Sequence, residues 1–157
     1  MFRRILVPVD YSEHSRASVR VAVDLAQKLG ASVDIAHVWD RPTYVSDAVM
    51  VRRPGEEHRS LADLIRENAE KDMSDFLAGL ELPEGVPVTQ CMWSGEPAQR
   101  LVEEAKTGGY DLIVVGTHGR AGVLHLLLGS TAERLIRLSP VPVLVVPPKA
   151  RGAASAG

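Results

Sequence analysis

The feature that most constrains the fold of this chain is a regular alternation of short apolar runs with segments of helical periodicity. Five short runs are mainly apolar, as expected of strands in a buried sheet. They span residues 3–9, 31–39, 86–93, 111–116 and 142–146. Four segments between them carry apolar residues at helical spacing. They span residues 12–29, about 57–80, about 96–107 and 130–138.

This alternation predicts an α/β fold with a doubly wound, five-stranded parallel sheet. Strands separated by a helix pair in parallel through right-handed crossovers, so helices cover both faces of the sheet. Five strands favour the flavodoxin-like, Rossmann-related arrangement over the six-stranded dinucleotide-binding one, and we expect the strand order 3-2-1-4-5. We expect residues 1–148 to form one domain and the small, polar stretch 149–157 to be a disordered tail.

The composition excludes several classes of partner. A net charge of −2 over 157 residues gives no basic surface for nucleic acid or for an anionic membrane. No apolar stretch approaches the roughly 20 residues that span a bilayer. Cys91 is the sole cysteine, which rules out an intrachain disulfide and favours a reducing compartment, the cytoplasm. The five histidines form no metal-ligand set, so no metal site is assigned.

A glycine-rich stretch, VVGTHGRAGVLHLLLGST at residues 114–131, follows the fourth strand. Gly116 and Gly119 lack a Cβ, so we expect the backbone there to take positive φ and to approach a ligand closely. Successive N–H groups in such a turn form an anion-binding concavity. Gly129 and Ser130 open a helix, whose first N–H groups are unpaired and whose dipole is positive at that end. With Arg120 and a magnesium ion, these groups would hold a di- or triphosphate at about micromolar affinity.

The ends of two strands converge on this stretch. In a doubly wound sheet the ligand lies where the strand order reverses, here between the first and fourth strands. Asp10 ends the first of these strands and Gly116 ends the other. The stretch does not match the P-loop, which requires a lysine, nor the GxGxxG dinucleotide fingerprint, nor the GxSxG hydrolase elbow.

The glycine spacing, Gly116-x2-Gly119-x9-Gly129-Ser130, resembles the nucleotide-binding motif of the universal stress protein family. ILVPVDYSEHS near the start, HVW in the second strand and SPVPVLVVP near the end resemble the same family, and the resemblance covers residues 1–148. It implies an ATP-binding domain, usually a homodimer, with stress-related regulatory roles. The segment from Asp40 to Glu57 matches the most variable region of that family and is assigned no contact.

The resemblance also implies a set of nucleotide-binding residues. Val9 and Asp10 would lie along the adenosine, with Pro8 beside them, and Val38 would offer backbone atoms to adenine. Val115 and Gly116 would line the ribose side. The residues that would surround the phosphates are Gly119, Arg120, Gly129, Ser130 and Thr131. His118 is added to this set on its position alone, because it lies between Gly116 and Gly119, where it would touch phosphate.

Two of these residues have a second interpretation. Asp10 and Glu13 have capping-box spacing, and so do Ser130 and Glu133, so each pair alternatively caps a helix. The function also has alternatives: a nucleotide-free dimeric scaffold, or a flavin mononucleotide carrier of the same fold. No base for fast phosphoryl transfer is evident, so any enzymatic activity is expected to be at most that of a slow ATPase.

The last strand is expected at an edge of the sheet. A flat, apolar, uncharged edge invites pairing with another chain. Prolines on both sides confine that pairing to a short piece. We therefore expect a twofold homodimer through the edge strand from Pro142 to Val146.

Overall fold

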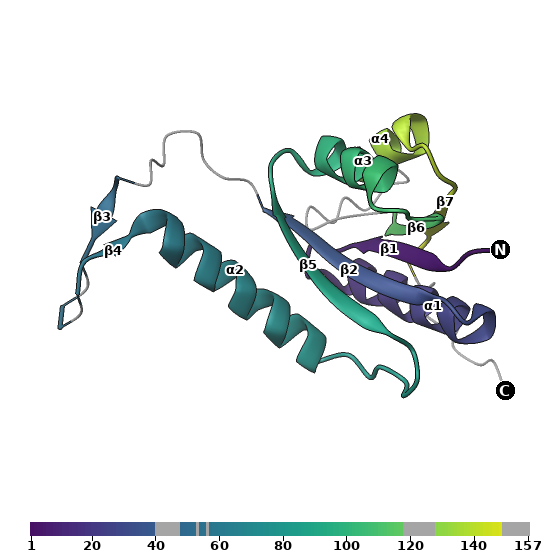
Figure 1. The fold of residues 1–157 in the computed structure, drawn as a ribbon, viewed down its shortest axis with the longest axis horizontal. Helices are drawn as coiled ribbons and strands as arrows, with labels where there is room; N and C mark the ends of the chain where they lie inside the picture. The colour runs from purple at the N-terminus through teal and green to yellow at the C-terminus, as the bar shows by residue number, and fades with distance from the viewer. Residues whose placement is uncertain (40–47, 53, 56, 118–127, 149–157) are drawn as a thin grey trace, which may run out of the picture.

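The computed structural model of the chain describes residues 1–39, 48–52, 54–55, 57–117 and 128–148 (Figure 1). Its centre is a five-stranded sheet in the order β5-β2-β1-β6-β7, in which all neighbours are parallel. These strands are β1 (Arg4–Pro8), β2 (Ser32–Trp39), β5 (Val88–Ser94), β6 (Leu112–Gly116) and β7 (Val143–Val146). Counted within the sheet, this is the order 3-2-1-4-5, so the predicted doubly wound α/β fold is confirmed.

Helices cover both faces of the sheet (Figure 1). In the described part of the chain they are α1 (Glu13–Leu29), α2 (Leu61–Ala78), α3 (Pro97–Thr107) and α4 (Ser130–Leu138). α1 and the second half of α2 pack on one face, and α3 and α4 pack on the other. Within these ranges, no helix combines the length and the apolar character needed to cross a membrane.

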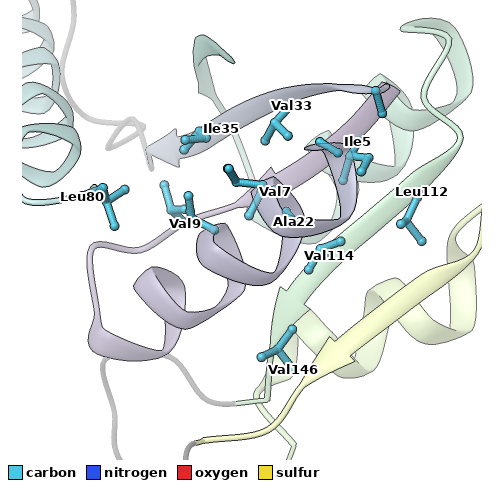
Figure 2. Close-up of a cluster of buried hydrophobic side chains, with 14 of the residues drawn as sticks. Ile5, Val7, Val9, Ala22, Val33, Ile35, Leu80, Leu112, Val114 and Val146 are labelled. Atoms are coloured by element: carbon cyan, nitrogen blue, oxygen red, sulfur yellow. The ribbon is translucent and has the colours of Figure 1, made fainter. Parts of the chain in front are cut away.

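The central strand β1 shows why its apolar run is continuous. Ile5 and Val7 point toward α1, where they join one core cluster (Figure 2). Leu6, between them, joins the cluster under α3 and α4. All three side chains are 0% exposed, because the strand is buried from both sides.

Helix α1 ends at a glycine. Gly30 has φ 65° and ψ 35°, a left-handed conformation that costs glycine little. Its N–H and that of Ala31 both bond to the carbonyl of Ala26, which satisfies the end of the helix.

The segment before α2 differs from the expectation. A short antiparallel pair, β3 (Met50–Val51) with β4 (Arg59–Ser60), stands where a loop leading into a helix from about Glu57 was expected. The helix begins only at Leu61, because the Ser60 side chain accepts a hydrogen bond from the Ala62 N–H and caps it there. Only Met73 and Phe76 of α2 are buried, so its first half projects from the body (Figure 1).

One buried carboxylate lies near the amino ends of the strands. Asp34, on β2, is 2% exposed and accepts hydrogen bonds from the Arg4 guanidinium at 2.7 and 3.1 Å and from the Tyr110 hydroxyl at 2.8 Å. The guanidinium also lies 4.6 Å from the centre of the Tyr110 ring. The buried charge is thus paired and hydrogen-bonded, as a charge in a protein core must be.

Candidate functional site

A cavity of about 390 Å³ opens at the carboxyl ends of the strands. It lies where the sheet order reverses, between the ends of β1, β2 and β6 on one side and the first turns of α3 and α4 on the other. This is the position at which doubly wound sheets bind ligands. Its described lining consists of Pro8, Asp10, Ser15, Ala36, Val38, Pro97, Leu101, Val115, Gly116, Gly129, Ser130, Thr131 and Ala132.

Eight of the twelve residues assigned to a nucleotide from the sequence line this cavity: Pro8, Asp10, Val38, Val115, Gly116, Gly129, Ser130 and Thr131. Val9 does not, because its side chain joins the core cluster on the α1 face of the sheet. His118, Gly119 and Arg120 lie outside the described residues. The fold therefore gathers residues from both ends of the chain into one cavity.

Five lining residues were missed from the sequence: Ser15, Ala36, Pro97, Leu101 and Ala132. Two of them carried a usable signal. Ala36 is two residues before Val38 on the same strand, so the period of two places both on one face. Pro97 is the first residue of α3, and Leu101 lies one helical turn later. The i, i+4 spacing therefore places both residues on the same face of the helix.

Asp10 does not cap α1, contrary to one of its two interpretations. The cap is Ser12, whose side chain accepts a hydrogen bond from the Ser15 N–H at 3.2 Å. Asp10 instead supports the cap. Its Oδ1 accepts from the N–H of Ser12 at 3.1 Å and from the hydroxyls of Ser12 and Ser15 at 2.5 and 2.6 Å.

The turn between Asp10 and Ser12 is tight. Tyr11 has φ 67°, a left-handed conformation that is uncommon outside glycine, asparagine and aspartate. Its ring stacks on His37 with centroids 4.4 Å apart, and it packs against Phe76 on α2. The Tyr11 side chain is thus packed on the α2 side, while Asp10 lines the cavity.

Three helices begin at this edge of the sheet, and their N-termini differ. Ser12 caps α1, and the Glu96 carboxylate caps α3 by accepting from the N–H groups of Ala98 and Gln99 at 3.3 and 2.9 Å. The N-cap of α4 is Gly129, which offers no side-chain hydrogen bond. The capping-box interpretation of Ser130 is therefore wrong, because Ser130 is already the first helical residue. Among the residues that the structure describes, no side chain caps the first N–H groups of α4, and Gly129, Ser130 and Thr131 line the cavity.

The Glu96 cap also holds α3 to α4. Its carboxylate lies 2.7 Å from the Arg134 guanidinium. Burial acts to raise the pKa of Glu96, but the N–H groups of Gln99 and Ala98, together with Arg134, outweigh it and lower that pKa. An ionised carboxylate thus occupies the positive end of α3, where the helix dipole favours it.

Gly116 serves a different purpose from the one expected. Its φ is not positive, so the proposed left-handed turn is absent at this position. A Cβ there would lie 3.2 Å from the Ser18 hydroxyl and 3.3 Å from both Cβ and the carbonyl oxygen of His14. The missing side chain therefore lets α1 pack closely against the end of β6.

Comparison with known families identifies relatives over nearly the whole chain. The model of the universal stress protein family matches residues 1–147. Universal stress protein YxiE of Bacillus subtilis is 32% identical over 149 residues, which covers 93% of this chain and 99% of that protein. Universal stress protein Rv2005c of Mycobacterium tuberculosis is 33% identical over 142 residues. The chain spans 44% of the length of that mycobacterial relative.

Solved structures agree with these sequence relatives. The structure of MJ0577 of Methanocaldococcus jannaschii superposes with a TM-score of 0.75 at 29% identity, covering 96% of this chain and 99% of that one. A universal stress protein solved in complex with cAMP has a TM-score of 0.58 at 26% identity, covering 92% of this chain and 97% of that one.

Proposed function

The chain belongs to the universal stress protein family, and from that premise we propose that it is an ATP-binding, stress-response regulatory protein. ATP would occupy the cavity at the carboxyl ends of the strands, and the occupied and empty forms would act as two states of a homodimeric switch. A relative of known structure was solved with cAMP, which supports an adenine nucleotide as the ligand class. We place the protein in the cytoplasm, because a single cysteine suits a reducing compartment.

The observation that carries this proposal is the uncapped N-terminus of α4 in the cavity wall. Unpaired N–H groups and the positive end of a helix dipole form a ready anion site. At the same edge, α1 and α3 fill their own N-termini with Ser12 and Glu96. A polyphosphate would therefore go to α4, where Gly129, Ser130 and Thr131 lie.

The rest of the cavity suits a nucleoside. Pro8, Ala36, Val38, Leu101 and Val115 give it an apolar wall, and Asp10 adds a carboxylate beside it. Such a mixture of apolar surface and a few fixed polar groups is typical of small-molecule sites. We assign the base and sugar to this wall and the phosphates to the start of α4, with His118, Gly119 and Arg120 completing the phosphate side.

A magnesium ion would arrive with the nucleotide. In the part of the chain that the structure describes, no group of three His, Cys, Asp or Glu side chains could hold a metal ion. Mg²⁺ is commonly bound through substrate phosphates and waters with few protein ligands. We propose that such an ion would be held mainly by the phosphates of the nucleotide.

We propose binding with, at most, slow hydrolysis. Fast phosphoryl transfer needs a group that positions the attacking nucleophile and several that neutralise charge. Asp10 is the one ionisable side chain among the described lining residues, and its Oδ1 already accepts three hydrogen bonds. The described lining residues thus support binding of a nucleotide more than its cleavage.

We propose that the homodimer forms through the edge strand β7. Leu144 on this strand is 37% exposed, and on the neighbouring helix Ile136 and Leu138 are 48% and 55% exposed. Exposed apolar side chains beside an edge strand favour pairing with a second copy. Replacing Leu144 with lysine should convert a dimer into a monomer by light scattering, and a wild-type monomer at high micromolar concentration would contradict the proposal.

The test of nucleotide binding is direct. Mass spectrometry should identify an adenine nucleotide that copurifies with the protein, and calorimetry with Mg·ATP should give an affinity near micromolar. At a ligand concentration of 100 Kd the folded state gains about 2.7 kcal/mol, which a thermal-shift assay detects readily. Absence of a shift with ATP, ADP, AMP and cAMP would favour the nucleotide-free scaffold instead.

A further inference from the structure

We propose that Ser15 is a positioning residue, which fixes the Asp10 carboxylate in the orientation that receives the nucleoside part of the ligand. This inference rests on the proposed function, because it concerns the same cavity and the same ligand. Ser15 is the third residue of α1, lines the cavity and is only 6% exposed. Neither the glycine motif nor the spacing of the strands pointed to it.

The Ser15 hydroxyl exchanges two hydrogen bonds with Asp10. It accepts from the Asp10 backbone N–H at 2.9 Å and donates to the carboxylate Oδ1 at 2.6 Å. A serine hydroxyl carries one proton. With that proton directed at Oδ1, Ser15 has none to give to a ligand, so it influences the ligand through Asp10.

This arrangement resembles a capping box that reaches two residues further back along the chain. In the capping box, the third helical residue reaches back to the N–H of the cap. Here Ser15 reaches past the cap, Ser12, to the N–H of Asp10. The Ser15 N–H is itself held by the Ser12 side chain at 3.2 Å. The turn that carries Asp10 is therefore tied to the first turn of a long helix.

The direction of the hydrogen bonds defines what Asp10 can recognise. All three bonds that Ser12 and Ser15 give to the carboxylate end on Oδ1. An ionised carboxylate only accepts hydrogen bonds. Its ligand partner must be a donor, which in a nucleotide is a ribose hydroxyl or the exocyclic amino group of the base.

The test compares two buried serines on the same helix. Ser15→Ala should weaken Mg·ATP binding about tenfold to a hundredfold by calorimetry, in the range of a lost hydrogen bond to a charged group. Ser18→Ala is the matched control. Ser18 is 0% exposed, but its hydroxyl donates to the carbonyl of His14 within the helix and does not line the cavity. We expect its affinity to match wild type within twofold.

A double-mutant cycle separates positioning from direct contact. In an Asp10→Ala background, Ser15→Ala should have no further effect on Mg·ATP affinity, because the residue it positions is gone. A penalty that persists in that background means that Ser15 touches the nucleotide itself and overturns the inference. Three-bond scalar couplings of Asp10 in the ligand-free protein give a second readout. They should report one side-chain rotamer in wild type and averaging in Ser15→Ala.

The outcomes also distinguish this inference from the proposed function. If wild type binds no adenine nucleotide, the proposed function fails and the binding role of Ser15 fails with it. If wild type binds and Ser15→Ala binds equally well with one Asp10 rotamer, only the role of Ser15 fails. Comparing ATP with its 2′,3′-dideoxy analogue then identifies the donor: the Ser15→Ala penalty should vanish with the analogue if Asp10 receives the ribose, and persist if it receives the base.

Discussion

Replacing Gly129 with aspartate should block the phosphate site without damaging the fold. Gly129 is the N-cap of α4, with φ −60° and ψ 146°, an extended conformation open to any residue. An aspartate at this position would accept hydrogen bonds from the first N–H groups of α4, as Glu96 does on α3. It would fill the N-terminus that is left open for the ligand.

The expected magnitudes have opposite signs for stability and for binding. An N-cap aspartate exceeds glycine by a few tenths of a kcal/mol, and its charge at the helix N-terminus adds about 0.3–1 kcal/mol. For a chain of this length, that corresponds to a rise in Tm of roughly 1–4 °C. The ligand would lose at least one charge-assisted hydrogen bond, about 1.5–3 kcal/mol, which weakens binding about tenfold to a hundredfold.

Scanning fluorimetry of the ligand-free protein and calorimetry with Mg·ATP measure the two quantities separately. Gly129→Asn is the matched control, since it caps the helix without a charge. We expect its affinity to lie between wild type and Gly129→Asp. The reasoning is refuted if Gly129→Asp binds Mg·ATP as tightly as wild type, because the α4 N-terminus would then not hold the phosphates.

Three further predictions concern residues around the site and the core. Burial, and then the bond to Asp34, raise the pKa of the Tyr110 phenol, so its contribution to stability is complete below pH 10 and is lost as pH rises further. Tyr110→Phe should therefore cost about 1–2 kcal/mol at pH 7 and lose less stability than wild type above pH 10, measured by urea unfolding. The pKa of Glu96 is lowered, so its contribution is present above about pH 4.3 and is lost as pH falls. Because the side chain is exposed, Glu96→Gln should cost only about 0.5 kcal/mol at pH 7 and nothing in strong acid, while Mg·ATP affinity is not weakened. Gly116→Ala should destabilise the protein by about 1–3 kcal/mol in the same unfolding assay, because a Cβ there meets α1 at 3.2 Å; an unchanged stability would mean that α1 shifts freely.

The sheet was predictable because its strands carry their own signal. Runs such as residues 5–9 and 112–116 contain no polar side chain, and helices separate the runs, which leaves few parallel topologies. Apart from the start of α2, the boundaries of the expected elements differ from the structure by no more than two residues. The place of the cavity followed from the same topology, since a doubly wound sheet fixes where its strand order reverses.

The caps were not predictable, because they depend on backbone conformation before the helix begins. Ser130 and Glu133 satisfy the capping-box spacing, yet the chain becomes helical one residue too early for Ser130 to act as the cap. Asp10 has the spacing too, but the left-handed Tyr11 turns the chain so that Ser12 takes that role. The spacing of residues in a sequence does not reveal the backbone angle φ of the residue between them, here Tyr11.

The N-termini of α3 and α4 differ in their caps, and this difference would set the orientation of a ligand in the cavity. Several helices of this fold begin at the carboxyl ends of the strands, and each helix N-terminus there is a possible anion-binding site. Because the Glu96 carboxylate already accepts hydrogen bonds from the first N–H groups of α3, an anionic tail would bind instead at the start of α4, beside Gly129. A ligand with one charged and one uncharged end would therefore enter in a single orientation, chosen by a residue that need not touch it.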